Sequence, residues 1–287
     1  MRTCLAVLSH LAVWPALYVV ASLVCTAQLA DEHAHWSRLA AAMCLTFLTA
    51  IATYLLDRVK LKDSWLDPAD AAAHPRRFAF LVQRARALRV SAACCLIGAI
   101  VAAMVLSPWA AALPVGAAVG VLFYAARPRR AHPRPKDLLL LKNSYVAAGV
   151  TGFVLLTLLA LRGREHLHGF ATSALAFAAV HLFLRVLADA ALCDLDDEAS
   201  DRRYGTATLP TTFGRVSAWN LAMVLRLGLA LGLALIPWAP LRPRLAWAVV
   251  TAASTVALRL ISPAALRDIV DIRFAIETAV VWLVLSW

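Results

Sequence analysis

Apolar residues along this chain are grouped into long blocks that are separated by polar, mostly basic segments. The blocks are roughly 14 to 25 residues long, and a helix needs about 20 residues to cross about 30 Å of hydrocarbon. The nine blocks are Leu5–Leu29, Leu39–Leu56, Val90–Leu106, Trp109–Ala126, Leu138–Leu161, Phe170–Ala188, Val216–Pro237, Leu245–Leu260 and Phe274–Trp287. This pattern predicts an all-α, polytopic membrane protein with about nine transmembrane helices.

Composition and charge support this prediction. Hydrophobic residues make up 62% of the chain, charged residues 16%, and the mean hydropathy is +0.74, whereas soluble domains are nearer half apolar and a quarter charged. The net charge of +11 would suit a nucleic-acid partner, but twenty of the 28 Lys and Arg residues lie at the N-terminus and at block junctions 2–3, 4–5, 6–7 and 8–9, with Lys142 at the start of the fifth block counted at junction 4–5. This alternation places the N-terminus in the cytoplasm and the C-terminus outside a cell (inner) membrane. The basic residues are therefore expected to meet the lipid bilayer or an anionic substrate, and not nucleic acid.

No soluble domain or low-complexity linker interrupts the blocks, so we expect a single transmembrane helical domain over 1–287. The second block ends in Asp57-Arg58, and the sixth is followed by an acidic and then a basic run. These similar endings suggest two motif-bearing halves, roughly 1–137 and 138–287, and hint at an internal duplication.

The strongest chemical signal is the acidic run after the sixth block. Asp194, Asp197 and Asp201 stand at i, i+3 and i+7, so on a helix they lie within about 60° of one another. Like charges on one helix face repel unless a cation is present. Mg²⁺ suits such a site because it is usually held by one or two carboxylates together with substrate phosphates. Arg202 follows at once and could hold a phosphate, although the spacing alone is equally compatible with a solvated acidic helix end.

This run resembles the second aspartate-rich motif of the UbiA family of intramembrane prenyltransferases. The residues that carry the resemblance are Asp194-x-x-Asp197-x-x-x-Asp201-Arg202-x-x-Gly205-x-x-Thr208-Leu209-Pro210. The segment Leu141-Lys142-Asn143-Ser-Tyr145, which enters the fifth block, is also similar to the family. Nine spans with both acidic motifs on the cytoplasmic side fit the same resemblance.

The resemblance implies a helical bundle around a central cavity that opens to the cytoplasmic side. In the family, Mg²⁺ clamps the diphosphate of a polyprenyl donor, the allylic C–O bond ionises, and an aromatic or other lipid-soluble acceptor captures the carbocation. The catalytic residues carried over by position are Asp57, Asp194, Asp197 and Asp201. The metal ligands are the same four together with Asp63. The diphosphate ligands are Arg58, Lys142, Asn143, Tyr145 and Arg202.

The first acidic motif departs from the family pattern Asn-x-x-x-Asp-x-x-x-Asp. Thr53 stands at the Asn position, Asp57 at the first Asp and Leu61 at the second. Asp63 and Asp67 lie just downstream and could substitute if the helix ends early. This departure puts the number of metal ions, or the activity itself, in question.

Charged residues within or beside the later blocks could either pair with one another for stability or belong to the active site or its lid. Arg185 and Asp189 form an i,i+4 pair near the interface in the simpler one, whereas in the other Asp189 continues the wall of the active site. Structural pairing is favoured over a role in a cytoplasmic lid for Asp268, Asp271, Arg273 and Glu277.

Three functions remain open from the sequence. The first is a Mg²⁺-dependent prenyltransferase that uses a polyprenyl diphosphate. The second is a membrane terpene cyclase of the same superfamily, which needs no acceptor, and the third is a non-catalytic lipid-binding or transport protein that retained the scaffold. The acceptor, the prenyl chain length and the oligomeric state leave no signal in the sequence.

Overall fold

The structure, a computed structural model, describes residues 7–30, 35–63, 66, 71, 74–125, 138, 139, 141–162, 172–260 and 266–286. Over these ranges the chain is built from helices and contains no strand. The elements are α2 (Val13–Leu29), α3 (Trp36–Val59), α5 (Pro75–Leu106), the 3₁₀ turn η2 (Pro108–Ala111), α6 (Ala112–Ala125), α7 (Leu141–Arg162), α8 (Thr172–Tyr204), α9 (Leu209–Phe213), α10 (Arg215–Leu235), α11 (Leu241–Leu258) and α12 (Leu266–Ser286).

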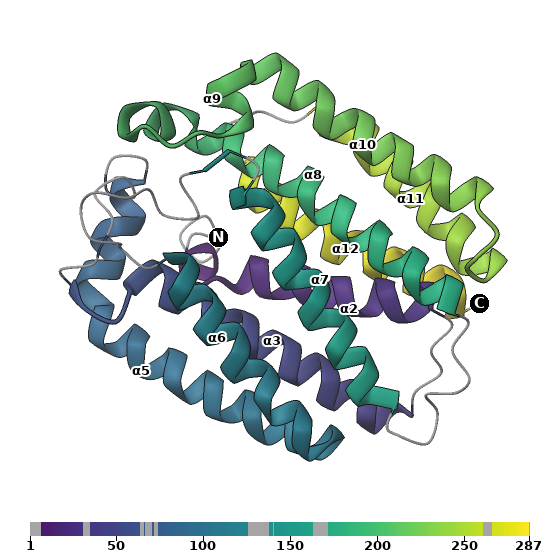
Figure 1. The fold of residues 1–287 in the computed structure, drawn as a ribbon, viewed down its shortest axis with the longest axis horizontal. Helices are drawn as coiled ribbons and strands as arrows, with labels where there is room; N and C mark the ends of the chain where they lie inside the picture. Colours follow the sequence, from purple (N-terminus) through teal and green to yellow (C-terminus); the bar gives the residue numbers. More distant parts are fainter. Residues whose placement is uncertain are drawn as a thin grey trace.

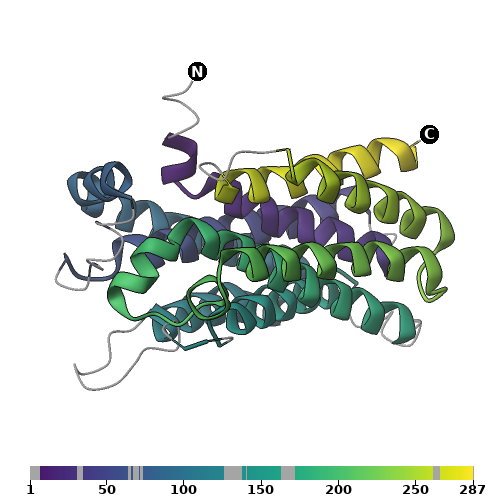
Figure 2. The same cartoon turned by 90° about the horizontal axis from the view of Figure 1, so that it is seen from above.

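The long helices form one elongated bundle, with α2 in its middle (Figure 1). On one side, α3 packs against α5 and α6; on the other, α8 packs against α7, α10 and α12. α2 contacts α3, α7, α8 and α12 and so joins the two sides. The start of α2 and the end of α12 lie at opposite ends of the bundle in both views (Figures 1 and 2).

The outer surface of the bundle is apolar, as a surface in contact with lipid has to be. Large exposed side chains include Phe123, Val216, Val249 and Leu260, at 65%, 73%, 68% and 87% exposure. Five helices, namely α3, α5, α7, α8 and α10, are long and apolar enough to cross a membrane by length and composition. The chain is therefore a multi-pass membrane protein, and the number of nine spans stays a prediction.

Helix α8 is longer than a membrane requires and carries the acidic run beyond its apolar part. Its 33 residues correspond to about 50 Å of helix, against about 30 Å of hydrocarbon. Gly205 then adopts a positive φ of 72°, a conformation that glycine adopts without steric cost. The N–H of Thr206 donates to the carbonyl of Asp201 at 2.9 Å and closes the last turn. Asp194, Asp197 and Asp201 thus belong to one continuous helix.

Candidate active site

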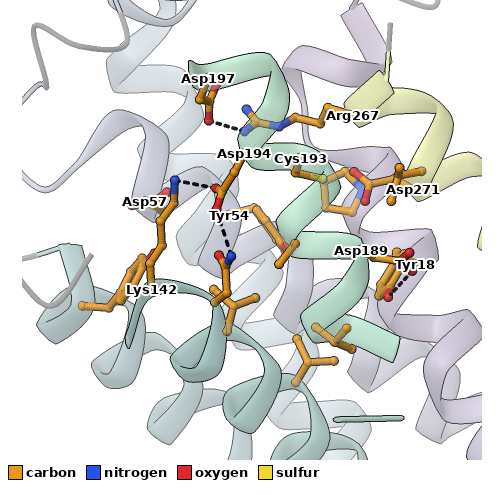
Figure 3. Close-up of a pocket in the computed structure, with 18 of the residues that line it drawn as sticks. Tyr18, Tyr54, Asp57, Lys142, Asp189, Cys193, Asp194, Asp197, Arg267 and Asp271 are labelled. Carbon is orange, nitrogen blue, oxygen red and sulfur yellow. Dashed lines mark hydrogen bonds and ion pairs between the residues drawn. The ribbon is translucent and has the colours of Figure 1, made fainter. Parts of the chain in front are cut away.

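A cavity of about 260 Å³ opens at the end of the bundle where α8 carries its acidic run (Figure 3). Its walls come from α2, α3, α7, α8 and α12, with one residue each from α5 and α6. The carboxylates that line it are Asp57, Asp189, Asp194, Asp197, Asp201 and Asp271. The basic side chains that line it are Arg58, Arg77, Lys142 and Arg267. The cavity is therefore rich in groups of both charges, which suits an anionic substrate accompanied by a cation.

The first turn of α7 faces the acidic run of α8. Lys142 Nζ lies 2.7 Å from Asp194 Oδ1 and 3.5 Å from Asp201 Oδ2. Asn143 donates its side-chain N–H to Asp194 Oδ2 at 2.8 Å. The sequence-predicted residues Lys142 and Asn143 are thus brought together with Asp194 and Asp201. One ammonium group therefore contacts two of the three carboxylates on this face of α8.

Asp197 is held by two basic residues that the sequence did not single out as site residues. His74, the residue before α5, lies 3.0 Å from Asp197 through Nε2. Arg267, in the first turn of α12, forms an ion pair with the other oxygen of Asp197 (Figure 3). The backbone N–H of Arg267 also donates to Asp196 at 2.8 Å. The negative charge of Asp197 raises the pKa of Arg267 well above its usual value.

Two of the predicted diphosphate ligands do not reach the cavity wall. Arg202 pairs with Glu198 one turn earlier at 3.0 Å, and its side chain is 56% exposed. The hydroxyl of Tyr145 donates to the carbonyl of Gly120 at 2.8 Å, and its ring stacks on Tyr124. Tyr124 itself lines the cavity, so Tyr145 supports the wall from behind. The sequence pattern alone gave no signal that either side chain points away.

The first acidic motif contributes one carboxylate to the cavity. Asp57 lines it, and Lys60 Nζ lies 2.6 Å from Asp57 Oδ1. Lys60 is only 4% exposed and adopts a positive φ of 51°, which is unfavourable for a residue with a Cβ. Arg89 donates to the carbonyl of Lys60 at 2.9 Å and stabilises this turn. The ammonium of Lys60 thus occupies one oxygen of Asp57.

Asp63, the carboxylate predicted to substitute for the one missing at Leu61, lies outside the cavity wall. Its side chain is 75% exposed, pairs with Arg89 and is absent from the cavity wall, so this arrangement gives no support to a metal-ligand role for Asp63. Asp67 lies outside the described residues. Arg58 does line the cavity, and it also donates to the backbone carbonyls of residues 9 and 10 at 2.7 and 3.0 Å.

The α8 carboxylates are better suited to bind Mg²⁺ together with a diphosphate than to bind Mg²⁺ alone. Among the described residues, no three His, Cys, Asp or Glu side chains are gathered closely enough to hold a metal alone. Asp194, Asp197 and Asp201 are hard oxygen donors on one wall, each paired with a cation from another element. Because Mg²⁺ usually takes one or two carboxylates plus phosphate oxygens, the donor set is sufficient once a diphosphate is present.

The inner end of the cavity changes from charged to apolar and then meets a buried charged cluster. Val146, Val150 and Val186 line the apolar part, and the hydroxyl of Tyr18 donates to Asp189 at 2.9 Å. The cluster consists of Arg185, Asp189, Arg226, Arg273 and Glu277, all at most 9% exposed.

Pairing across helices dominates this cluster. Asp189 lies 2.5 Å from Arg226 and 2.9 Å from Arg273, whereas its distance to Arg185 is 4.0 Å. Arg185 instead pairs with Glu277. Both interpretations of Asp189 therefore hold in part, because it is a paired residue and also lines the cavity. Structural pairing likewise holds for Arg273 and Glu277.

Asp271 differs from its neighbours in α12. It lines the cavity and precedes the apolar part of the helix. Burial, together with the nearby Asp189, raises the pKa of Asp271 to about 7, although Arg267 acts in the opposite direction. Asp268, one turn earlier, accepts a hydrogen bond from Ser9 at 2.8 Å. The sequence contained both carboxylates but could not show which one faces the cavity.

Comparisons with known proteins find similar solved structures but no similar sequence. No protein-family model matches the sequence, and no curated protein matches it. A UbiA homologue from Aeropyrum pernix K1, solved in the apo form, is 14% identical, with 94% of this chain and 96% of that chain covered and a TM-score of 0.67. A UbiA homologue from Archaeoglobus fulgidus, bound to DMAPP and Mg²⁺, is 14% identical, with 96% and 99% covered and a TM-score of 0.64.

A third similar structure concerns a digeranylgeranylglyceryl phosphate synthase in membranes. It is 13% identical, with 99% of this chain and 97% of that chain covered and a TM-score of 0.55. All three similarities span nearly the full length of both chains. The chain therefore has the fold of the UbiA homologues, and the fold expected from the acidic motif is confirmed.

Proposed function

We propose that this chain belongs to the UbiA family and is an intramembrane prenyltransferase that moves a polyprenyl group from its diphosphate to a lipid-soluble acceptor. One observation carries the proposal: the α8 carboxylates and four basic side chains line one cavity that also has an apolar part, formed by Val146, Val150 and Val186. A prenyl diphosphate has the same distribution of properties, with a charged head and a hydrocarbon tail. The fold supports the proposal, since a structural relative binds DMAPP and Mg²⁺.

The head of the donor is proposed to lie between α8 and the basic side chains. Lys142 and Arg267 already touch the carboxylates Asp194 and Asp197, so both are within reach of a diphosphate bound there. Bound Mg²⁺, held by Asp194, Asp197 and Asp201, would neutralise part of the diphosphate charge. Positive groups aimed at the leaving diphosphate stabilise the charge that develops as the allylic C–O bond breaks.

The prenyl tail is proposed to extend along the apolar inner part of the cavity. Val146 and Val150 from α7 face Val186 from α8 across this part. A low-polarity wall keeps water away from an allylic carbocation and so favours its capture by the acceptor. By the charge alternation of the connecting segments, the cavity mouth faces the cytoplasm of a cell (inner) membrane.

A binding or transport protein is the second candidate, and a specific contact favours it. Lys60 occupies one oxygen of Asp57, and Leu61 stands where the family pattern has a second carboxylate. An intact acidic wall on α8, with Asp194 only 2% exposed at the cavity, favours the enzyme.

One experiment separates the two candidates. The full chain, purified in detergent, is incubated with radiolabelled geranyl, farnesyl and geranylgeranyl diphosphates, with Mg²⁺ or with EDTA. An enzyme releases diphosphate from at least one donor in a Mg²⁺-dependent manner. Binding of a donor without release of diphosphate, with every acceptor tried, would establish the binding protein instead.

A further inference from the structure

Among the residues that the structure describes, Asp271 is the one cavity carboxylate without a hydrogen-bond or ion-pair partner. Within the described part of the chain, each of the other five lies in an ion pair or a hydrogen bond. Asp57 pairs with Lys60, and both Asp194 and Asp201 pair with Lys142. Asp189 contacts Tyr18, Arg226 and Arg273. Asp197 contacts His74 and Arg267. Asp271 forms no hydrogen bond or ion pair with any described residue, although it lines the cavity. A carboxylate in this position is available to act on a ligand.

The surroundings of Asp271 keep it poised between its two protonation states. The titratable and charged groups that face it are Arg267 and Asp268 from its own helix, Asp189 and Cys193 from α8, and Tyr54 and Arg58 from α3. Burial raises the pKa of Asp271 to about 7, close to the pH at which a general base is most effective. The neighbouring wall, formed by Tyr54 and Cys193 (Figure 3), can accommodate a polar, uncharged group.

We propose that Asp271 is the general base of the prenyl transfer and that the acceptor is a hydroxyl compound, bound where α3, α8 and α12 meet. The proposal rests on the proposed function. The allylic C–O bond breaks and its electron pair leaves with the diphosphate. A lone pair of the acceptor oxygen then forms the new C–O bond, and the hydroxyl proton passes to the carboxylate of Asp271. The products are a prenyl ether, diphosphate and protonated Asp271, which returns its proton to water.

The remaining cavity carboxylates are less suited to this step. Asp194 already contacts Lys142 and Asn143. Burial opposes the ionisation of Asp197, but the adjacent Arg267 and His74 outweigh it and lower the pKa of Asp197, which makes this carboxylate a weaker base. They also stand where the diphosphate is proposed to bind. Lys142 and Asp271 lie on opposite sides of the view in Figure 3. Metal binding is thus assigned to the carboxylates of α8, and proton removal to Asp271 on α12, one turn after Arg267.

The test separates ionisation of the donor from removal of the proton. Geranyl diphosphate with ¹⁸O in its C–O–P bridge is incubated with Mg²⁺ and the full chain in detergent. Water serves as the smallest hydroxyl nucleophile and gives geraniol. Movement of ¹⁸O into non-bridging positions reports ionisation followed by return, and geraniol reports capture with loss of a proton. The variant is Asp271→Asn, and the matched control is Asp268→Asn, one turn earlier and outside the cavity wall.

We expect Asp271→Asn to retain ¹⁸O scrambling and geranyl diphosphate affinity within about twofold, and to form geraniol about 10²-fold more slowly, the low end of general-base effects. In the wild type, geraniol formation should rise between pH 6 and pH 8, because Asp271 loses its proton there, whereas in Asp271→Asn it should not. Asp268→Asn should keep the wild-type rate of geraniol formation and the rise with pH, with the rise shifted to lower pH, because the charge of Asp268 raises the pKa of Asp271. Unchanged geraniol formation in Asp271→Asn, or loss of scrambling together with geraniol, would overturn the assignment.

A second measurement needs no turnover. Infrared difference spectra between pH 5 and pH 8 should show a protonated carboxyl band that titrates near pH 7 in the wild type and is missing in Asp271→Asn. If no such band exists, Asp271 is not the base. Failure of the proposed function has a different signature, since the wild type would then scramble no ¹⁸O at all. If the wild type scrambles ¹⁸O but forms no geraniol because water is excluded, the infrared titration still tests whether Asp271 can act as the base.

Discussion

Replacement of Asp194 by asparagine tests the link between the acidic wall and catalysis most directly. Asp194 is 2% exposed and accepts contacts from Lys142 at 2.7 Å and Asn143 at 2.8 Å. Asparagine has almost the same shape, so it removes the charge and one acceptor oxygen without leaving a hole. Asp197 and Asp201 are unchanged in this variant.

The cost to stability should be small compared with the cost to catalysis. A hydrogen bond to a charged group contributes about 1.5–3 kcal/mol, and Lys142 retains Asp201 at 3.5 Å as a partner. Relief of repulsion between carboxylates on one helix face offsets a few tenths of a kcal/mol. Because Lys142 keeps Asp201 as a partner, the low end of the range applies, and we expect Asp194→Asn to lower the free energy of unfolding by about 1–2 kcal/mol. Weakened stabilisation of the leaving diphosphate should slow its release about 10²- to 10³-fold, corresponding to about 3–4 kcal/mol.

The assay measures Mg²⁺-dependent diphosphate release from geranyl diphosphate together with thermal unfolding in the same detergent. Glu198→Gln is the matched control, because Glu198 lies on the same helix, pairs with Arg202 and Arg215, and does not line the cavity. It should release diphosphate within about twofold of the wild type. Release at the wild-type rate by Asp194→Asn would refute the role given to the acidic wall.

Three further substitutions probe other parts of the site. Lys60→Met removes the ammonium group that contacts Asp57 and should strengthen Mg²⁺ binding in the presence of geranyl diphosphate by about tenfold, since a neighbouring charge commonly contributes about 1.4 kcal/mol. An unchanged Mg²⁺ titration would show that Lys60 does not restrain Asp57. Arg267→Gln should weaken geranyl diphosphate binding by about 10- to 100-fold in equilibrium binding, and an unaltered affinity would remove Arg267 from the donor site. Glu277→Gln leaves three guanidinium groups with one carboxylate in the buried cluster and should lower the free energy of unfolding by about 3–5 kcal/mol. This loss should exceed that of Arg226→Gln in the same thermal unfolding assay, and a larger loss for Arg226→Gln would contradict the pairing.

The buried charged cluster also shapes the inner end of the cavity. Asp189 belongs to both, because it pairs with Arg226 and Arg273 and also lines the cavity. The cluster ties α8, α10 and α12 together within the apolar bundle, where charges are tolerated when they are paired. A fixed Asp189 in turn orients Tyr18, whose hydroxyl it holds at 2.9 Å. The inner end of the cavity is thus set by contacts between helices that are far apart in the sequence.

The sequence by itself determined the features that follow from local geometry. Apolar blocks of membrane-crossing length predict helices because the backbone has to satisfy its own hydrogen bonds in hydrocarbon. The spacing of Asp194, Asp197 and Asp201 places them on one face because a helix advances by about 100° per residue. The structure extends α8 through all three, so this part of the candidate site was predictable. The fold was predictable as well, through the resemblance that these residues carry.

Only the tertiary structure decided which side chains meet around that face. Arg267 and Asp271 lie some seventy residues after the acidic run, and no local rule places α12 beside α8. Arg202 is adjacent to Asp201 in sequence but pairs with Glu198 and lies outside the cavity wall. Lys60 contacts Asp57 at the end of α3, where Lys60 adopts a positive φ. Each of these contacts depends on how whole helices pack or end, and that information is spread over side chains distant in the chain.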